Sequence, residues 1–243
     1  MHVIVESASV FPCLRGGIFL ERKLKNVQLV VFDLGRVLVR ICAGWQHACR
    51  CAGVALPGRV ASPADQLKLR DLTFQADLGE LDVCGFCRAA APLIGLNESQ
   101  VRALSDAFIR GPFPGAAELI DELNALGVAT ACLSNTNDNH WKLMSDRASP
   151  VHFPLHRLSH RFASHLIGAR KPDEAIYAHV EQKTGVDPRS ILFFDDVLEN
   201  VEAGRKRGWL AHQIDVAPND PIPQIRRVLT ASGILAESSA NQR

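Results

Sequence analysis

A short apolar run that ends in a single carboxylate constrains this chain more than any other feature. Residues Leu29–Phe32 are apolar and do not alternate with polar residues, which is typical of a strand buried on both faces. Asp33 follows directly, and a carboxylate at the end of a buried strand needs a partner. Because the carboxyl ends of strands line the ligand crevice of open α/β sheets, we expect Asp33 at a functional site.

Two later stretches repeat this design, and helical patterns separate them. Ala129–Asn135 and Ile191–Asp196 are apolar runs that end in polar residues. Helices are predicted over 116–126, 174–183 and 199–207, and a further strand over 209–214. Strands that alternate with helices predict a parallel sheet covered on both faces. The expected fold class is therefore α/β, with a three-layer, Rossmann-like core.

Residues 42–111 differ from the rest of the chain because their apolar positions recur at helical spacing. Asp82 and Asn97 stand where helix caps are expected. We therefore predict an inserted, all-helical cap over 42–111, and a core made of 27–41 and 112–236. Within the core, the proline-interrupted stretch 141–162 is expected to be irregular. Candidate pocket-facing residues of the cap are Trp45, Arg70, Phe74 and Phe86.

Both ends of the chain lack these patterns. Residues 1–26 contain short apolar pieces broken by charges and prolines, without the continuous apolar run of a secretory signal. We expect a loosely packed or disordered extension there, and a flexible tail over 237–243.

Composition limits the class of protein. The chain of 243 residues carries 27 Lys and Arg against 26 Asp and Glu, which argues against a nucleic-acid or anionic-membrane partner. No apolar run approaches the length of a membrane span. The seven cysteines show no disulfide-framework spacing, so we expect reduced thiols in a cytoplasmic enzyme. We also expect a monomer or a homodimer. Cys84 and Cys87 have helical spacing and are interpreted as packing residues rather than metal ligands.

Four polar elements are expected to meet at the carboxyl edge of the sheet. They are Asp33, the pair Ser134-Asn135, Lys171 and the pair Asp195-Asp196. Phosphoryl transfer needs a nucleophile, charge neutralisation and in-line positioning, and these residue types supply all three. Each element also has a simpler interpretation. Asp33 could be a capping or metal-only carboxylate, and Ser134-Asn135 could cap a helix. Lys171 could be an ordinary helix entry before Pro172, and Asp195-Asp196 could be a solvated acidic turn.

In this order and number, the motifs resemble those of the haloacid dehalogenase superfamily, and more closely its branch of α-D-glucose-1-phosphate phosphatases. The matching segments are Asp33–Val37, Ser134–Asn137, Lys171 and Phe193–Asp196 followed by Asn200. The resemblance implies that Asp33 is the nucleophile, and that Ser134, Asn135 and Lys171 hold the phosphate. It also implies Mg²⁺ held by Asp33, Asp196 and the Gly35 carbonyl, with Asp195 as an alternative ligand or a support behind them.

Two residues depart from the superfamily pattern. Gly35 stands where most of its phosphatases have a second aspartate, the general acid, whose help is typically worth about 10²–10⁴-fold. Arg36 stands where the close branch has asparagine; we interpret it as pointing outward rather than contacting a second anionic group. His140 could supply part of the missing acid–base function, but a surface position is the favoured interpretation.

The sequence therefore predicts a Mg²⁺-dependent phosphatase that acts on a small phosphorylated metabolite through an aspartyl-phosphate. Without the second aspartate, leaving groups that need little protonation are expected, so anomeric sugar phosphates or aryl phosphates are favoured. The main alternative is a non-catalytic relative that binds a phosphorylated ligand or a protein. A haloacid dehalogenase is disfavoured, because that enzyme has no use for the acidic pair Asp195-Asp196 as a metal site.

Overall fold

The computed structural model describes residues 27–56, 62–216 and 220–236. The predicted extension over 1–26 and the predicted tail over 237–243 lie outside these described residues.

A five-stranded parallel sheet forms the centre of the molecule and confirms the α/β fold class. Its strand order is β5-β4-β1-β6-β7, and every neighbouring pair is parallel. The strands are β1 (Leu29–Phe32), β4 (Ala129–Ser134), β5 (His160–Ala163), β6 (Ile191–Asp195) and β7 (Leu210–Gln213). β1 lies in the middle, so both of its faces are covered and its side chains are all apolar.

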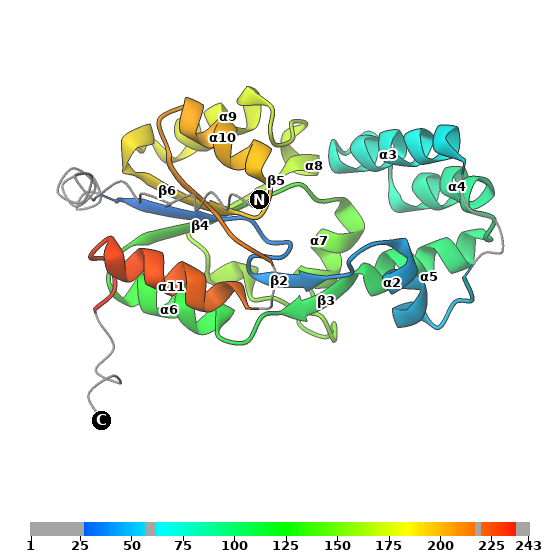
Figure 1. Ribbon diagram of the computed structural model, residues 1–243, viewed down its shortest axis with the longest axis horizontal. Helices are drawn as coiled ribbons and strands as arrows, with labels where there is room; N and C mark the ends of the chain where they lie inside the picture. Colours follow the sequence, from blue (N-terminus) through cyan, green and yellow to red (C-terminus); the bar gives the residue numbers. More distant parts are fainter. Residues whose placement is uncertain (1–26, 57–61, 217–219, 237–243) are drawn as a thin grey trace, which may run out of the picture.

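Helices cover both faces of this sheet (Figure 1). On one face lie α6 (Ala116–Ala125) and α11 (Pro221–Ala231), and on the other lie α9 (Glu174–Thr184) and α10 (Leu198–Lys206). Successive side chains of a strand point to opposite faces. Accordingly, Val30 and Phe32 of β1 pack with α6 and α11, and Leu29 and Val31 pack with α9 and α10.

The stretch 141–162 is more ordered than its prolines predict. It contains most of α7 (Asp138–Ser145), the short helix η1 (Leu155–Arg157) and the first residues of β5. The expectation of an irregular segment is therefore wrong. β5 is short, lies at the edge of the sheet and exposes His160 and Arg161 more than its last two residues, so it lacks the apolar run that identifies β1.

Four helices form a lobe at the carboxyl end of the strands (Figure 1). This helical lobe consists of α2 (Trp45–Ala52), α3 (Pro63–Asp77), α4 (Val83–Ile94) and α5 (Glu98–Phe108). The predicted caps are present: the Asp82 side chain accepts from the Gly85 N–H at 2.7 Å, and Asn97 forms a capping box with Gln100.

A two-stranded antiparallel ribbon joins the helical lobe to the core. It pairs β2 (Val39–Ile41) with β3 (Ile109–Pro112). β3 includes residues 109–111, so the expectation that 42–111 is entirely helical is wrong at that end. Ile109 and Gly111 are buried there while Arg110 is exposed, an alternation that suits a strand better than a helix.

The helical lobe also contacts the core through α7 and α8 (Ser164–Ile167). Arg102 of α5 donates to Asn139 Oδ1 of α7 at 2.9 Å, and Asn139 Nδ2 donates to Asp106 Oδ1 at 2.8 Å. Just after α3, Gly79 has φ 77°, and a Cβ there would lie 2.4 Å from the carbonyl oxygen of His165. Only glycine permits so close an approach of the two backbones.

Candidate active site

A buried lysine joins two strand ends at the carboxyl edge of the sheet. The Lys171 Nζ donates to Asp33 Oδ1 at 2.8 Å and to Asp195 Oδ2 at 2.6 Å. Asp33 follows β1 and Asp195 ends β6, and these strands are neighbours. The Lys171 side chain is 1% exposed and that of Asp195 is fully buried. The structure thus brings together three of the residues that the sequence places at one site.

Asn135 determines where Lys171 lies. The Lys171 N–H donates to Asn135 Oδ1, and Asn135 Nδ2 donates to the Lys171 carbonyl, both at 2.8 Å. The side-chain amide of Asn135 is therefore engaged with the protein backbone, although the sequence predicts that it contacts phosphate. Ser134 ends β4, beside β1, and is buried at the same edge of the sheet.

Asp195 is fixed by a set of donors in addition to Lys171. Asn200 Nδ2 lies 3.0 and 3.1 Å from its two carboxylate oxygens, and the Val197 N–H donates to Oδ1 at 2.8 Å. A solvated acidic turn is therefore the wrong interpretation for this residue. Asn200 holds the turn in place, a role that its spacing in the sequence already suggests.

Arg36 contacts the fourth charged group of the site. Its Nη1 lies 3.3 Å from Oδ2 of Asp196, whose side chain is 8% exposed. The expectation that Arg36 points outward is therefore wrong, although its own side chain stays half exposed. Arg36 has φ 61°, a left-handed backbone conformation that costs a non-glycine residue roughly 1–2 kcal/mol and that asparagine tolerates better.

Burial dominates the electrostatics of this cluster. It raises the pKa of Asp33 to about 7; Lys171 opposes the shift, and Asp195 and Asp196 add to it. Burial and the neighbouring Asp195 also raise the pKa of Asp196. Burial alone would lower the pKa of Lys171, but the carboxylates of Asp195 and Asp33 outweigh it and keep the ammonium charged.

The donor set fits a hard divalent cation. One carboxylate oxygen from each of Asp33, Asp195 and Asp196 lies within 4.8 Å of the others. Mg²⁺ is usually bound by one or two carboxylates together with water and phosphate oxygens. Three carboxylates against the cations of Lys171 and Arg36 leave one negative charge in excess, which a divalent ion would offset.

Two cavities adjoin this edge of the sheet. The smaller, of about 80 Å³, is lined by Gly35, Ser134 and Asn135 among others. The larger, of about 240 Å³, lies between the helical lobe and α7, and its walls are mostly apolar. Phe108 and His140 line both cavities, so the two lie next to each other. The apolar residues of its lining are Trp45, Ala76, Leu81, Val83, Phe86, Leu104 and Phe108.

Of the four pocket-facing candidates in the sequence, Trp45 and Phe86 line the larger cavity. Phe74 is used differently: the guanidinium carbon of Arg170 lies 3.8 Å from its ring centroid. The same guanidinium lies 3.6 Å from Asp77, whose pKa is raised to about 6 by burial in spite of Arg170. This contact between α3 and the residue before Lys171 leaves no local pattern in the sequence, because Arg170 and Asp77 are 93 positions apart.

His140 is half-buried rather than on the surface, so the favoured sequence interpretation is wrong. Its ring stacks on Phe108 with centroids 5.9 Å apart. Nε2 lies 3.0 Å from the Ser105 carbonyl oxygen, and Nδ1 lies 3.3 Å from the amide nitrogen of Asn137. Both ring nitrogens are thus engaged, and burial lowers the pKa of His140. The contacts of both nitrogens are therefore with groups of α5 and of the turn before α7.

No helix within the described residues combines the length and the apolar character that crossing a bilayer requires.

Comparison with known families identifies the class of protein. The family model of haloacid dehalogenase-like hydrolases matches residues 73–208, more than half of the chain. The chain therefore belongs to the haloacid dehalogenase-like hydrolase family. The match covers Ser134, Asn135, Lys171, Asp195 and Asp196 and begins after Asp33, so the place of Asp33 rests on the geometry at the end of β1.

Individual relatives agree with this membership. A phosphatase of Mycobacterium tuberculosis is 34% identical over 110 residues, 45% of this chain and 48% of that protein. A sesquiterpene phosphatase of Aspergillus oryzae is 32% identical over 120 residues, 48% of this chain and 59% of that protein. These matches thus span about half the length of either relative.

Solved structures show the same fold. A HAD family enzyme of Bacteroides thetaiotaomicron, solved with magnesium and inorganic phosphate, superposes with a TM-score of 0.66. It is 20% identical, and the superposition covers 79% of this chain and 96% of that one.

Proposed function

We propose that this chain is a Mg²⁺-dependent phosphatase that hydrolyses small phosphate monoesters through an aspartyl-phosphate on Asp33. The observation that carries the proposal is the buried Lys171, whose ammonium contacts both Asp33 and Asp195 at the carboxyl edge of the sheet. A lysine shared between two buried carboxylates, with Asp196 close to both, leaves an excess of negative charge; a divalent cation would offset that charge and allow a phosphate to bind.

In the proposed reaction, a carboxylate oxygen of Asp33 attacks the phosphorus, and the bond to the leaving oxygen breaks. Lys171 stays protonated because of its two carboxylates and offsets the charge of the phosphoryl oxygens. Ser134 Oγ, at the end of β4, and the backbone N–H of Asn135, the next residue, are the groups that would donate to those oxygens. Water then attacks the aspartyl-phosphate, which releases inorganic phosphate and restores the Asp33 carboxylate.

Asp33 and Asp196 would hold the Mg²⁺, together with the Gly35 carbonyl. Asp195 would support them from behind, since its oxygens already accept hydrogen bonds from Lys171, Asn200 and Val197. When bound, the ion would neutralise negative charge that develops on the transferred phosphoryl group.

Gly35 limits the leaving group. The phosphatases of the superfamily usually have the general acid at this position, and His140, whose two ring nitrogens already contact Asn137 and Ser105, is not placed to replace it. The enzyme should therefore favour phosphates whose leaving group departs with little protonation. Anomeric sugar phosphates meet this requirement, as the resemblance to the glucose-1-phosphate branch suggests, and so do aryl and allylic phosphates.

The larger cavity supports a second substrate class within the same activity. A sugar needs several polar partners, whereas seven apolar side chains dominate this lining. An apolar aryl or allylic phosphate therefore fits the cavity better than a sugar phosphate. The name of the Aspergillus oryzae relative, a sesquiterpene phosphatase, points to the same chemistry.

Phosphate release from a panel of esters, with and without Mg²⁺, tests the proposal. The panel contains an aryl phosphate, an allylic terpenyl phosphate, an anomeric sugar phosphate and a sugar 6-phosphate. We expect Mg²⁺-dependent turnover in the first three and little with the last. Asp33→Asn should reduce kcat by at least about 10⁴-fold, as loss of a nucleophile does in other enzymes.

The matched control is Asp71→Asn, an exposed carboxylate on α3 whose loss should leave kcat unchanged. If the folded wild-type chain binds Mg²⁺ and phosphate but turns over none of the esters, the phosphatase proposal fails. The non-catalytic alternative, a binder of phosphorylated ligands or proteins, would then replace it.

A further inference from the structure

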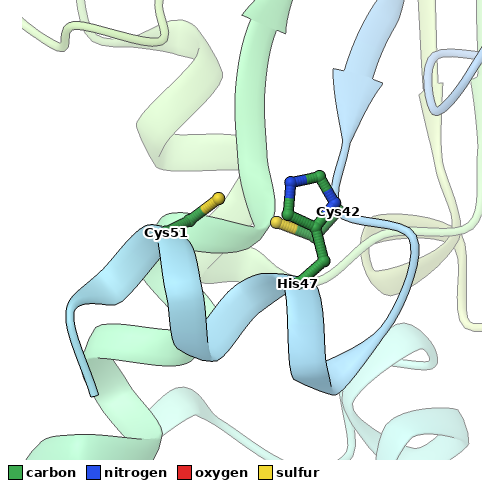
Figure 2. Close-up of side chains that lie close together, drawn as sticks. All are labelled: Cys42, His47 and Cys51. Carbon is green, nitrogen blue, oxygen red and sulfur yellow. The ribbon is translucent and has the colours of Figure 1, made fainter. Parts of the chain in front are cut away.

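A second cluster of metal-binding side chains lies where the chain enters the helical lobe. Cys42 follows β2, and His47 and Cys51 belong to α2 (Figure 2). One donor atom from each residue lies within 4.8 Å of the other two. His47 and Cys51 are four residues apart in a helix, a spacing that places both side chains on one face. Figure 2 shows this face turned toward Cys42.

The backbone around the cluster is held in place by the two chain segments that connect the lobe to the core. The Cys42 N–H donates to the Phe108 carbonyl at 2.9 Å, and the Cys42 thiol donates to the Ala107 carbonyl at 3.4 Å. Cys42 is therefore fixed against the end of α5, while its own strand leads back to the sheet. Cys42 is fully buried, and His47 and Cys51 are partly exposed, so a small ion can reach the donors from solvent.

We propose that Cys42, His47 and Cys51 bind a thiophilic divalent cation, for which Zn²⁺ is the best match. Two thiolates and an imidazole are the donors that Zn²⁺ prefers, and its bonds to them are about 2.0–2.3 Å long. Donor atoms within 4.8 Å need to move by about an ångström or less to reach such an ion. The described residues add no fourth Cys, His, Asp or Glu to this cluster, so water completes the tetrahedron.

Binding has a defined proton balance. Both thiols lose a proton when they become thiolates. Nδ1 of His47 accepts from the Ala43 N–H at 3.2 Å, which assigns the ring proton to Nε2. When Nε2 binds the ion, that proton moves to Nδ1 and the long, exposed hydrogen bond to Ala43 is lost. About two protons are thus released for each ion bound.

Zinc titration of the full chain, with thiols kept reduced, tests this site. Mg²⁺ in excess and the Asp33→Asn background weaken the competing binding of Zn²⁺ at the carboxylates of Asp195 and Asp196. We expect one Zn²⁺ per chain, and Co²⁺ in its place should give a thiolate-to-cobalt charge-transfer band. Because loss of a supporting residue around a ligand already costs roughly 10–100-fold in affinity, Cys51→Ser and His47→Gln should each weaken binding by more than about 100-fold.

Two further variants separate ligand loss from misfolding. Cys84→Ser, an exposed cysteine of α4 outside the cluster, should bind as the wild type does. Cys51→His keeps a ligand at that position, so it should retain Zn²⁺ while the charge-transfer band loses about half its intensity. If His47→Gln and Cys51→Ser fold and bind Zn²⁺ as tightly as the wild type, or if Co²⁺ gives no thiolate band, the proposal is wrong.

Discussion

The carboxyl edge of the sheet and the helical lobe differ in the polarity and the solvent exposure of their side chains. At the carboxyl edge of the sheet, Asp33, Lys171 and Asp195 are charged and nearly inaccessible to water. In the lobe, the cavity is open to solvent and its lining is largely apolar. The first arrangement costs stability unless each charge keeps its partners, whereas the second costs little. In the proposed function, the buried charged cluster of the sheet would carry the chemistry and the apolar cavity of the lobe would select the substrate.

The largest effect that would sharpen this contrast is loss of the shared lysine. Lys171→Met leaves Asp33 and Asp195 buried without their cation, so the free energy of unfolding should fall by about 3–5 kcal/mol. Urea denaturation measures this change, and Mg²⁺ should restore part of it.

Lys142→Met is the matched control for Lys171→Met. Lys142 also pairs with a carboxylate, Asp138 at 2.8 Å, but its side chain is 74% exposed. Its loss should change the free energy of unfolding by less than about 1 kcal/mol. Equal destabilisation by the two variants would show that the buried cluster is no different from a surface pair.

Truncation of the cavity wall should affect substrate selection without affecting the chemistry. Phe86→Ala removes a large apolar contact, so kcat/KM for an apolar aryl phosphate should fall by roughly 10–200-fold. Steady-state kinetics measure this, with competitive inhibition by inorganic phosphate as the second readout. That inhibition constant should not move, because the proposed phosphate site lies at the sheet.

Leu67→Ala provides the comparison for Phe86→Ala. Leu67 belongs to α3 but is 53% exposed and does not line the cavity. It should leave both kinetic readouts unchanged. An equal loss for Phe86→Ala and Leu67→Ala would mean that the cavity does not hold the substrate.

The raised pKa of Asp33 predicts the pH dependence of turnover. The nucleophile must be ionised, and a pKa of about 7 leaves it mostly protonated below that pH. At low Mg²⁺, kcat/KM should therefore fall up to about tenfold per pH unit below 7. Protons and Mg²⁺ compete for the same carboxylate, so higher Mg²⁺ should move this acid limb to lower pH. If the pH at which kcat/KM falls does not change with the Mg²⁺ concentration, the assignment of Asp33 is wrong.

The smallest expected effect concerns Arg36. Arg36→Asn reduces the backbone strain of the left-handed conformation at this position, but it also removes the ion pair with Asp196. The gain and the loss in the free energy of unfolding should largely cancel. The free energy of unfolding should change by less than about 1 kcal/mol. Mg²⁺ affinity should rise, because Asp196 then lacks its competing cation. Calorimetric titration with Mg²⁺ measures this, and weaker Mg²⁺ binding in the variant would show that Arg36 supports the metal site.

The parts of the structure that the sequence predicts are those set by local pattern. β1, β4 and β6 are apolar runs, and the rule that parallel strands share a carboxyl edge then brings Asp33 and Asp195 together. Lys171 has no such pattern, and its place at the site came from the family resemblance. Its contact with both carboxylates depends on a loop held by Asn135.

Other features could not be predicted from the sequence, because segments far apart in the chain form them together. Five helices (α2, α3, α4, α5 and α7) and the connecting residues Gly44, Leu81 and Asn137 build the larger cavity, and no single stretch predicts it. The direction of the Arg36 side chain was predicted wrongly, because it depends on the left-handed backbone conformation of Arg36 itself and not on the residue type. The Cys42, His47 and Cys51 cluster did leave a signal, a helical i, i+4 pair preceded by a cysteine, that the sequence analysis did not use.

The hydrogen bonds between α5 and α7 have a consequence for engineering. α7 begins directly after the Ser134–Asn137 turn, and Arg102, Asp106 and Asn139 tie it to α5. The part of the cavity lining that α7 contributes, Asp138 and His140, therefore follows directly on the turn beside Asp33. Libraries that randomise the part of the lining contributed by α3 and α4, at Thr73, Leu81, Val83 and Phe86, should change the preference for the proposed substrates and leave the position of Asp33 unchanged.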